Sequence, residues 1–147
     1  MNQSGQEFSG FRLLIDAILV LMILVIIIGI LGWVDSLRFQ ISEKRLYEGF
    51  NKSLNSPDGK TVVEKDITMR SGTTYLVGAF AGPGVDRDCI RFRALNLTAW
   101  KLSSNKKQLD IETDIVIDVF YQCTRQFDEG ACEILCEISF GDEFEED

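Results

Sequence analysis

Histidine is absent from this chain of 147 residues. The usual general base, proton shuttle and commonest metal ligand is therefore missing, which argues against most acid–base enzymes. Basic residues are also few, with 15 Lys and Arg against 23 Asp and Glu, and the formal net charge is -8. An acidic chain without a basic cluster lacks the charges that neutralise phosphates, so we expect no nucleic-acid partner. Because no serine lies in a Gly-x-Ser-x-Gly setting, we expect no enzyme, no catalytic residues and no cofactor.

The hydrophobic residues are concentrated near the N-terminus. Ala17–Val34 contains no charged residue, and extending the run back to Leu13 admits only Asp16. A helix needs about 20 apolar residues to cross a hydrocarbon core about 30 Å thick. The run is longer than the apolar part of a secretory signal, about 7–15 residues, and no small-residue cleavage site follows it. The sequence therefore predicts a single membrane anchor in contact with lipid.

Two signals disagree on the orientation of this anchor. Arg12 is the only basic residue before the run, whereas several follow it between residues 38 and 45. The positive-inside rule alone would keep the C-terminal part in the cytoplasm. Four cysteines suit an oxidising exterior, and the Asn-x-Ser/Thr triplets at Asn51 and Asn96 are compatible with glycosylation there. We favour a single-pass protein whose C-terminal domain lies outside the cell membrane.

The helical pattern continues beyond the apolar run. Apolar residues recur every three or four positions with polar residues between them, as in an amphipathic helix. This stripe comprises Leu37, Ile41, Tyr47, Phe50 and Leu54, with Lys44 and Arg45 at the position between Ile41 and Tyr47. Turn-forming residues at Asn55–Gly59 include a proline and end the pattern. We therefore predict a short polar N-terminus at residues 1–10, then one helix at residues 11–54.

After Gly59 the period changes to two, which indicates strands. The clearest predicted strand is Leu109–Cys123, and Cys132–Phe140 is the last one. Shorter candidates are Thr61–Met69, Thr74–Phe80, Cys89–Leu95 and Ala99–Ser103. Several short strands predict a small antiparallel β-sandwich-like domain at residues 60–140, packed on the amphipathic part of the helix. The fold class is therefore α+β, and we expect the acidic tail at residues 141–147 to be frayed.

The four cysteines are interpreted as two disulfides. If the last two long strands form a hairpin, Cys123 faces Cys132 across its loop, which leaves Cys89 to pair with Cys136. This is one of three connectivities that four cysteines allow. The alternative is a four-thiolate zinc site, but only Cys132 and Cys136 have the spacing of a zinc knuckle. We therefore expect no bound metal.

Asp16 is the one ionisable residue within the apolar region, where charge is costly and often functional. Arg12 lies four positions earlier on the same helix face, so an ion pair at the headgroup level is one explanation. The other is that Asp16 meets a cation on a neighbouring subunit and sets the axial register of an assembly. Gly29 and Gly32 would allow close helix approach, but they lack the Gly-x-x-x-Gly spacing. All four are candidate helix-assembly residues.

The order of these parts resembles archaeal type IV pilin-like proteins. The matching features are Ser4–Glu7, the apolar run Leu13–Val34, its helical continuation to Phe50, and the strands after Gly59. The resemblance implies a helix that supports a β-rich domain. It also implies a leader at residues 1–5, cut after Gly5 so that Gln6 becomes the first residue.

These features predict a structural protein of the cell envelope. The leading hypothesis is a pilin-like subunit of a surface filament, in which the N-terminal helices of neighbouring copies pack together. The alternative is a single-pass accessory subunit that does not polymerise and uses its β domain to bind other membrane subunits. An extracytoplasmic enzyme or metal protein is the third and weakest interpretation.

Overall fold

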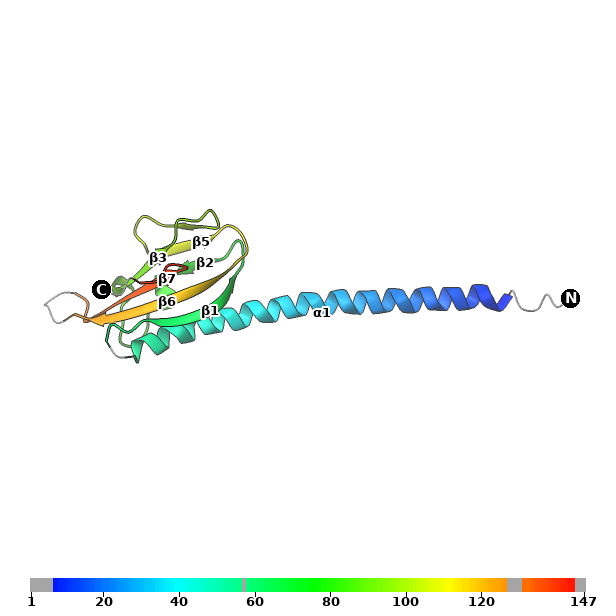
Figure 1. Ribbon diagram of the computed structural model, residues 1–147, viewed down its shortest axis with the longest axis horizontal. Coiled ribbons are helices and arrows are strands. Elements are labelled where there is room, and N and C mark those ends of the chain that lie inside the picture. The colour runs from blue at the N-terminus through cyan, green and yellow to red at the C-terminus, as the bar shows by residue number, and fades with distance from the viewer. Residues whose placement is uncertain (1–6, 57, 127–130, 145–147) are drawn as a thin grey trace. The chain divides into compact units, whose positions relative to one another are not determined.

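The computed structural model describes residues 7–56, 58–126 and 131–144 (Figure 1). One long helix, α1 (Glu7–Leu54), precedes all the strands. The strands are β1 (Val62–Met69), β2 (Thr74–Leu76), β3 (Ile90–Ala94), β4 (Trp100–Leu102), β5 (Gln108–Ile111), β6 (Ile115–Arg125) and β7 (Ile134–Phe140), with short 3₁₀ helices η1 (Val77–Ala79) and η2 (Arg87–Cys89). The chain divides after Leu37 into two compact units, and we call the part of the second unit that follows α1 the head.

The helix α1 ends where the turn-forming residues begin. The Asn55 side-chain amide donates to the Asn51 carbonyl (2.9 Å), and the Ser56 hydroxyl donates to the Lys52 carbonyl (2.7 Å). These bonds help to satisfy the carbonyls of the last helical turn, where the Asn55 backbone amide also donates to the Asn51 carbonyl (3.3 Å). Gly59 then adopts a φ of 77°, a left-handed conformation that glycine adopts without strain. The structure thus confirms the single long helix that the sequence predicts.

The strands of the head form two sheets, but these are not purely antiparallel as the sequence predicted. The four-stranded sheet has the order β1-β6-β7-β3, and the three-stranded sheet has the order β2-β5-β4. In the first sheet β3 and β7 are parallel, so that sheet is mixed. A parallel pair needs a long crossover connection. The chain provides one, because β4, β5 and β6 all intervene between β3 and β7.

The predicted strand Leu109–Cys123 is two strands in different sheets. β5 belongs to the three-stranded sheet and β6 to the four-stranded sheet, and residues 112–114 form the corner between them. The Ser71 amide donates to the Asp114 carboxylate (2.7 Å), and the Glu112 amide donates to the Ala99 carbonyl (2.8 Å). The predicted alternation survives the corner, since Leu109 and Val119 are both fully buried.

A second predicted strand is shorter than expected. Thr74–Phe80 is extended only as far as Leu76 and then turns through η1. The Phe80 amide donates to the Val77 carbonyl (3.1 Å), which closes this turn. The turn carries the buried Phe80 ring toward α1, where it lies 4.9 Å from the Tyr47 ring.

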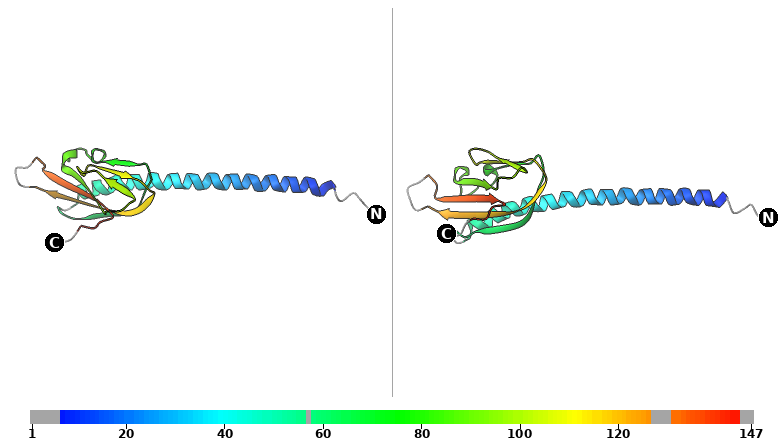
Figure 2. Two further views of the ribbon diagram at one scale, coloured as in Figure 1. Left: turned by 90° about the horizontal axis from the view of Figure 1, so that it is seen from above. Right: turned by 45° about the horizontal axis from the view of Figure 1, so that its top comes forward.

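One hydrophobic core holds the head together, between the two sheets and the last part of α1 (Figure 2). Its centre is a series of aromatic rings in edge-to-face contact. Phe80 contacts Phe50 at 5.6 Å and Phe92 at 5.7 Å, and Phe92 contacts Phe140 at 5.3 Å, all between ring centroids. Such pairs stabilise a core by about 0.5–1.5 kcal/mol beyond the area they bury.

The described part of the acidic tail is bonded back onto the head, which corrects the expectation that it frays. The Gly141 amide donates to the Asp118 carbonyl (2.9 Å), and the Ser139 hydroxyl donates to the Asp142 carbonyl (2.5 Å). Phe144 is only 7% exposed. This aromatic residue, surrounded by acidic neighbours in the sequence, therefore anchors the chain.

All four cysteines are in disulfides, but the expected pairing is wrong. Cys123 pairs with Cys136 (Cα–Cα 4.1 Å), and Cys89 pairs with Cys132 (Cα–Cα 5.5 Å). The register of the β6–β7 hairpin explains the difference, because Cys123 lies directly opposite Cys136. Cys132 precedes the first residue of β7 and instead joins the end of η2.

We predict that mapping of the unreduced protein will recover these two pairs. Trypsin leaves Cys132 and Cys136 on one peptide, so the digest must also be cut after Glu133, which separates them. The expected products are a linked peptide pair that contains Cys89 and Cys132, and another that contains Cys123 and Cys136. Mass spectrometry before and after reduction identifies both. Linkage of Cys123 to Cys132 would contradict the hairpin register.

Candidate functional site

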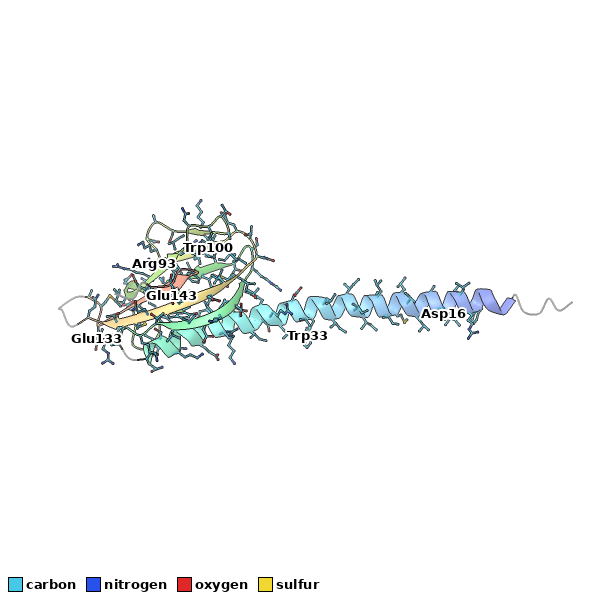
Figure 3. The ribbon with its side chains drawn as sticks, in the orientation of Figure 1. Asp16, Trp33, Arg93, Trp100, Glu133 and Glu143 are labelled. Carbon is cyan, nitrogen blue, oxygen red and sulfur yellow. A yellow bond between two sulfur atoms is a disulfide. The ribbon has the colours of Figure 1, made fainter. Side chains whose placement is uncertain are left out.

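The first part of α1 exposes apolar side chains on every side. From Phe11 to Trp33 its large hydrophobic residues are 41–69% exposed. Within the described residues, α1 is long and apolar enough to cross a membrane, and none of its most apolar window is buried. An all-round apolar helix must be surrounded by lipid or by other helices. Trp33, at the end of the run, is the type of residue enriched at membrane–water interfaces (Figure 3).

The predicted helix-assembly residues all lie on this exposed segment. Asp16 lines a shallow apolar groove with Ala17 and neighbouring leucine and valine residues. Among the side chains that the structure describes, Arg12 and Asp16 form no ion pair within 4 Å, although Lys44 and Glu48 do at the same spacing. A methyl group added at Gly29 or Gly32 would meet no described atom within 4 Å. The predicted processing residues, Gly5 and Gln6, lie outside the described residues.

The rest of α1 packs on the head through a face that matches the predicted stripe only in part. Tyr47, Phe50 and Leu54 of the stripe pack in or against the core. Ile41, assigned to the stripe, is 56% exposed. The buried positions that the stripe did not include are Ser42, Leu46, Gly49 and Ser53. These residues follow the expected helical period, but three of them are small. Hydrophobicity therefore located the helix and part of its contact face, and it missed the small side chains that allow close approach.

Gly49 marks the closest approach of α1 to the sheet. A Cβ atom at this position would lie 2.6 Å from Glu64 Cγ and 2.7 Å from Tyr121 Cε2. Both distances are shorter than van der Waals contact. Glu64 comes from β1 and Tyr121 from the adjacent strand β6. A residue without a side chain is therefore required where α1 crosses these two strands.

Glu64 joins β1 to α1 through two cations. Its carboxylate accepts a hydrogen bond from Lys52 Nζ (2.5 Å) and another from Arg45 Nη2 (3.3 Å). Arg45 and Lys52 are seven residues apart, which is two helical turns, so they project from the same face of α1. The Glu64 side chain is 9% exposed, and a buried carboxylate needs such partners. We call Arg45, Lys52 and Glu64 the helix clasp.

Hydrogen bonds beside the clasp connect α1 to β1, the edge strand of its sheet. The Thr68 amide donates to the Ser42 hydroxyl (3.1 Å), and the Arg45 guanidinium donates to the Lys65 carbonyl (2.9 Å). An uncovered edge strand offers such groups to other chains. The Tyr121 hydroxyl also donates to the Leu46 carbonyl (2.8 Å) inside the core. The helix therefore bonds to backbone groups of this edge strand as well as to the core.

Two buried tyrosines near this contact are held in the neutral form. Burial, with a smaller contribution from Glu43, raises the pKa of Tyr75 to about 12. Burial also raises the pKa of Tyr121 far above its usual value. Tyr121 therefore keeps its proton at ordinary pH and remains the donor to α1.

Within the described residues, no group of three His, Cys, Asp or Glu is placed to hold a metal ion.

The two predicted glycosylation residues lie in different settings. Asn51 is exposed on α1, but Ser53 of the same triplet is 2% exposed and its hydroxyl has no hydrogen-bond partner among the described atoms. Asn96 lies in the irregular loop between β3 and β4, where Leu97 and Thr98 are also exposed. The sequence alone does not distinguish the two triplets. In the structure, one lies in a helix and has a buried serine, and the other lies in an exposed loop.

Comparison with known proteins adds no assignment: no family model, curated protein or solved structure matches the chain. Two features of the molecule bear on its function, the exposed apolar helix and its attachment to the head.

We predict that Gly49→Ala will destabilise the head. The new methyl group has to displace Glu64 or Tyr121, and overpacking of this kind costs about 1–3 kcal/mol. Gly78→Ala is the matched control, because a methyl group there meets nothing within 4 Å of the described atoms. Chemical unfolding of both variants in detergent measures the difference. Equal stability of the two would show that α1 does not approach the sheet this closely.

Breaking the helix clasp should also destabilise the head. Glu64→Gln removes the negative charge between Arg45 and Lys52. We expect the free energy of unfolding to fall by about 1–3 kcal/mol, because two charge-assisted bonds are weakened; water partly screens these bonds, which limits the loss. Glu48→Gln is the control, since Glu48 pairs with Lys44 at the surface and such pairs contribute about 0–1 kcal/mol. Denaturant midpoints measure the stability of both variants. A larger loss of stability in Glu48→Gln than in Glu64→Gln would refute the stabilising role of the helix clasp.

Proposed function

We propose that the protein is a structural subunit of the cell envelope, built like a pilin. In this proposal the apolar part of α1 is held in the membrane before assembly and packs against the same segment of neighbouring copies in a surface filament. The head lies outside the cell and forms the outer layer of the filament. Membrane lipid and further copies of the chain are its partners.

The observation that carries this proposal is the length and all-round apolarity of α1. Its 48 residues would span about 72 Å at 1.5 Å per residue. A bilayer core needs only about 30 Å of this length. The apolar side chains from Phe11 to Trp33 are exposed on all sides and need a low-polarity environment in any state of the protein. Lipid provides it for a single copy, and neighbouring helices provide it in a filament.

The attachment of α1 to the head supports a role in assembly. The helix clasp and the edge bonds to β1 join the last part of α1 to the head through charged, polar and backbone groups. The same continuous helix supplies the exposed apolar segment. Subunits that assemble through that segment therefore bring their heads into the assembly, because α1 contributes residues to both.

The disulfides support an outward-facing head. Cys89–Cys132 and Cys123–Cys136 account for all four cysteines. Disulfides persist in oxidising compartments and are rare in a reducing cytosol. Their presence outweighs the basic residues that follow the apolar run, which by themselves would favour the opposite orientation.

Intact cells that express the full chain test both parts of the proposal. A membrane-impermeant protease should digest the head without lysis, and electron microscopy of sheared surface material should show filaments that contain the chain. A head that is digested only after lysis would refute the outward orientation. An accessible head with dispersed, non-filamentous protein would refute the filament and favour the accessory subunit of a membrane complex.

Substitution of Asp16 tests whether the helix itself directs assembly. If Asp16 meets a cation on a neighbouring copy, Asp16→Asn should reduce filament yield while leaving membrane insertion unchanged. Asp35→Asn is the matched control, because Asp35 is an exposed acid just beyond the apolar run. A similar yield from both variants would mean that Asp16 does not set the packing.

A further inference from the structure

The chain contains two Asn-x-Ser/Thr triplets, which are the acceptor motif for an N-linked glycan, and they differ in backbone conformation. Asn51–Ser53 is helical throughout, within the last turns of α1. Asn96–Thr98 lies between β3 and β4, with neither helical nor strand backbone. This difference matters because glycan transfer depends on the relative position of two side chains in the triplet.

The transfer reaction has defined requirements. The asparagine side-chain nitrogen attacks the anomeric carbon of a sugar carried on a lipid diphosphate. A nitrogen–carbon bond forms, the carbon–oxygen bond to the diphosphate breaks, and the lipid diphosphate leaves with the electron pair. The amide loses one proton to the transferase. The transferase binds the hydroxyl two residues later together with the asparagine, so both side chains must face the enzyme at once.

The helical triplet does not meet this requirement. Residues two apart on an α-helix do not face each other. The structure shows the result directly, since Asn51 is exposed whereas Ser53 is 2% exposed and faces the head. Helices also form in about 0.1–1 μs, far faster than a ribosome adds about 5–20 residues per second. The segment therefore has time to adopt its helical backbone while the rest of the chain is still being synthesised.

The loop triplet meets the requirement that the asparagine and the hydroxyl face the enzyme together. All three of its residues are exposed, and the backbone on each side is fixed. The Leu95 amide donates to the Phe140 carbonyl (3.2 Å), and Trp100 Nε1 donates to the Leu95 carbonyl (2.7 Å). Figure 3 labels Trp100 on the head, beside this loop. The bonds hold the base of the loop while leaving Asn96 and Thr98 free of the core.

Two exposed leucines in the same loop also favour a glycan at this position, because it would cover them. Leu95 is 40% exposed and Leu97 is 44% exposed, and these two residues flank Asn96. A carbohydrate joined to Asn96 lies next to both leucines, and the C–H faces of its sugar rings can cover them. The glycan would therefore add a polar outer surface where the head is apolar.

We propose that Asn96 is the N-glycan acceptor of this protein and that Asn51 is not modified. The proposal rests on the outward orientation of the head given above, because the transferase and its lipid-linked sugar act on that side of the membrane. Its substrate is an oligosaccharide carried on a lipid diphosphate.

Translation of the full chain with rough microsomes tests this assignment. These vesicles contain an oligosaccharyltransferase and its lipid-linked donor. The wild-type chain and Asn51→Gln should each gain one glycan, seen as a single shift in gel mobility that endoglycosidase reverses. Asn96→Gln should gain none. Thr98→Ala should also lose the glycan while keeping the asparagine, whereas Thr98→Ser should retain it.

Protease protection in the same vesicles separates the two possible failures. If the head is protected but Asn96 carries no glycan, or if the glycan is on Asn51, the acceptor assignment is wrong and the orientation stands. If protease digests the head in intact vesicles, the orientation and the acceptor assignment are both wrong. A protected head with one glycan that requires Asn96 and Thr98 supports both.

Discussion

The contact at Gly49 is the constraint on which the rest of the head depends. There α1 passes so close to Glu64 and Tyr121 that no side chain fits between them. The short distance allows the Tyr121 hydroxyl to reach the Leu46 carbonyl, and it places the Glu64 carboxylate within reach of cations two helical turns apart. A wider separation would leave a buried charge without partners, which costs several kcal/mol, so the close packing and the clasp require each other.

This contact also explains how a mixed sheet with an open edge is protected. β1 has β6 on one side, and α1 bonds to its backbone at Lys65 and Thr68. Exposed edges pair readily with other chains. In a protein proposed to assemble through helices, the covering of this edge limits association through strands. At the far side of the sheet, β3 is joined to the hairpin end by the Cys89–Cys132 disulfide.

The helix α1 serves two environments along one continuous backbone. Its first part carries apolar residues on all sides and suits lipid or neighbouring helices. Its last part presents small residues to the head and charged residues to β1. The change follows from the side chains, because Ser42, Gly49 and Ser53 permit close backbone approach whereas the leucine and isoleucine residues of the first part do not. One helix can thus connect an assembly surface to a folded domain without an intervening hinge sequence.

Local patterns in the sequence determined the long helix, its end at the turn-forming residues, the existence of most strands and the residues that face the core. These features depend on side-chain periodicity and turn chemistry, which act over a few residues. The tertiary structure decided the parallel pairing of β3 with β7, the corner at residues 112–114 and the disulfide pairing. Each depends on which distant segments meet, and Cys123 found Cys136 because the strand register placed them opposite each other. The small residues on the contact face of α1 were missed for the same reason, because the side chains of Ser42, Gly49 and Ser53 carry no hydrophobic signal that marks them as buried.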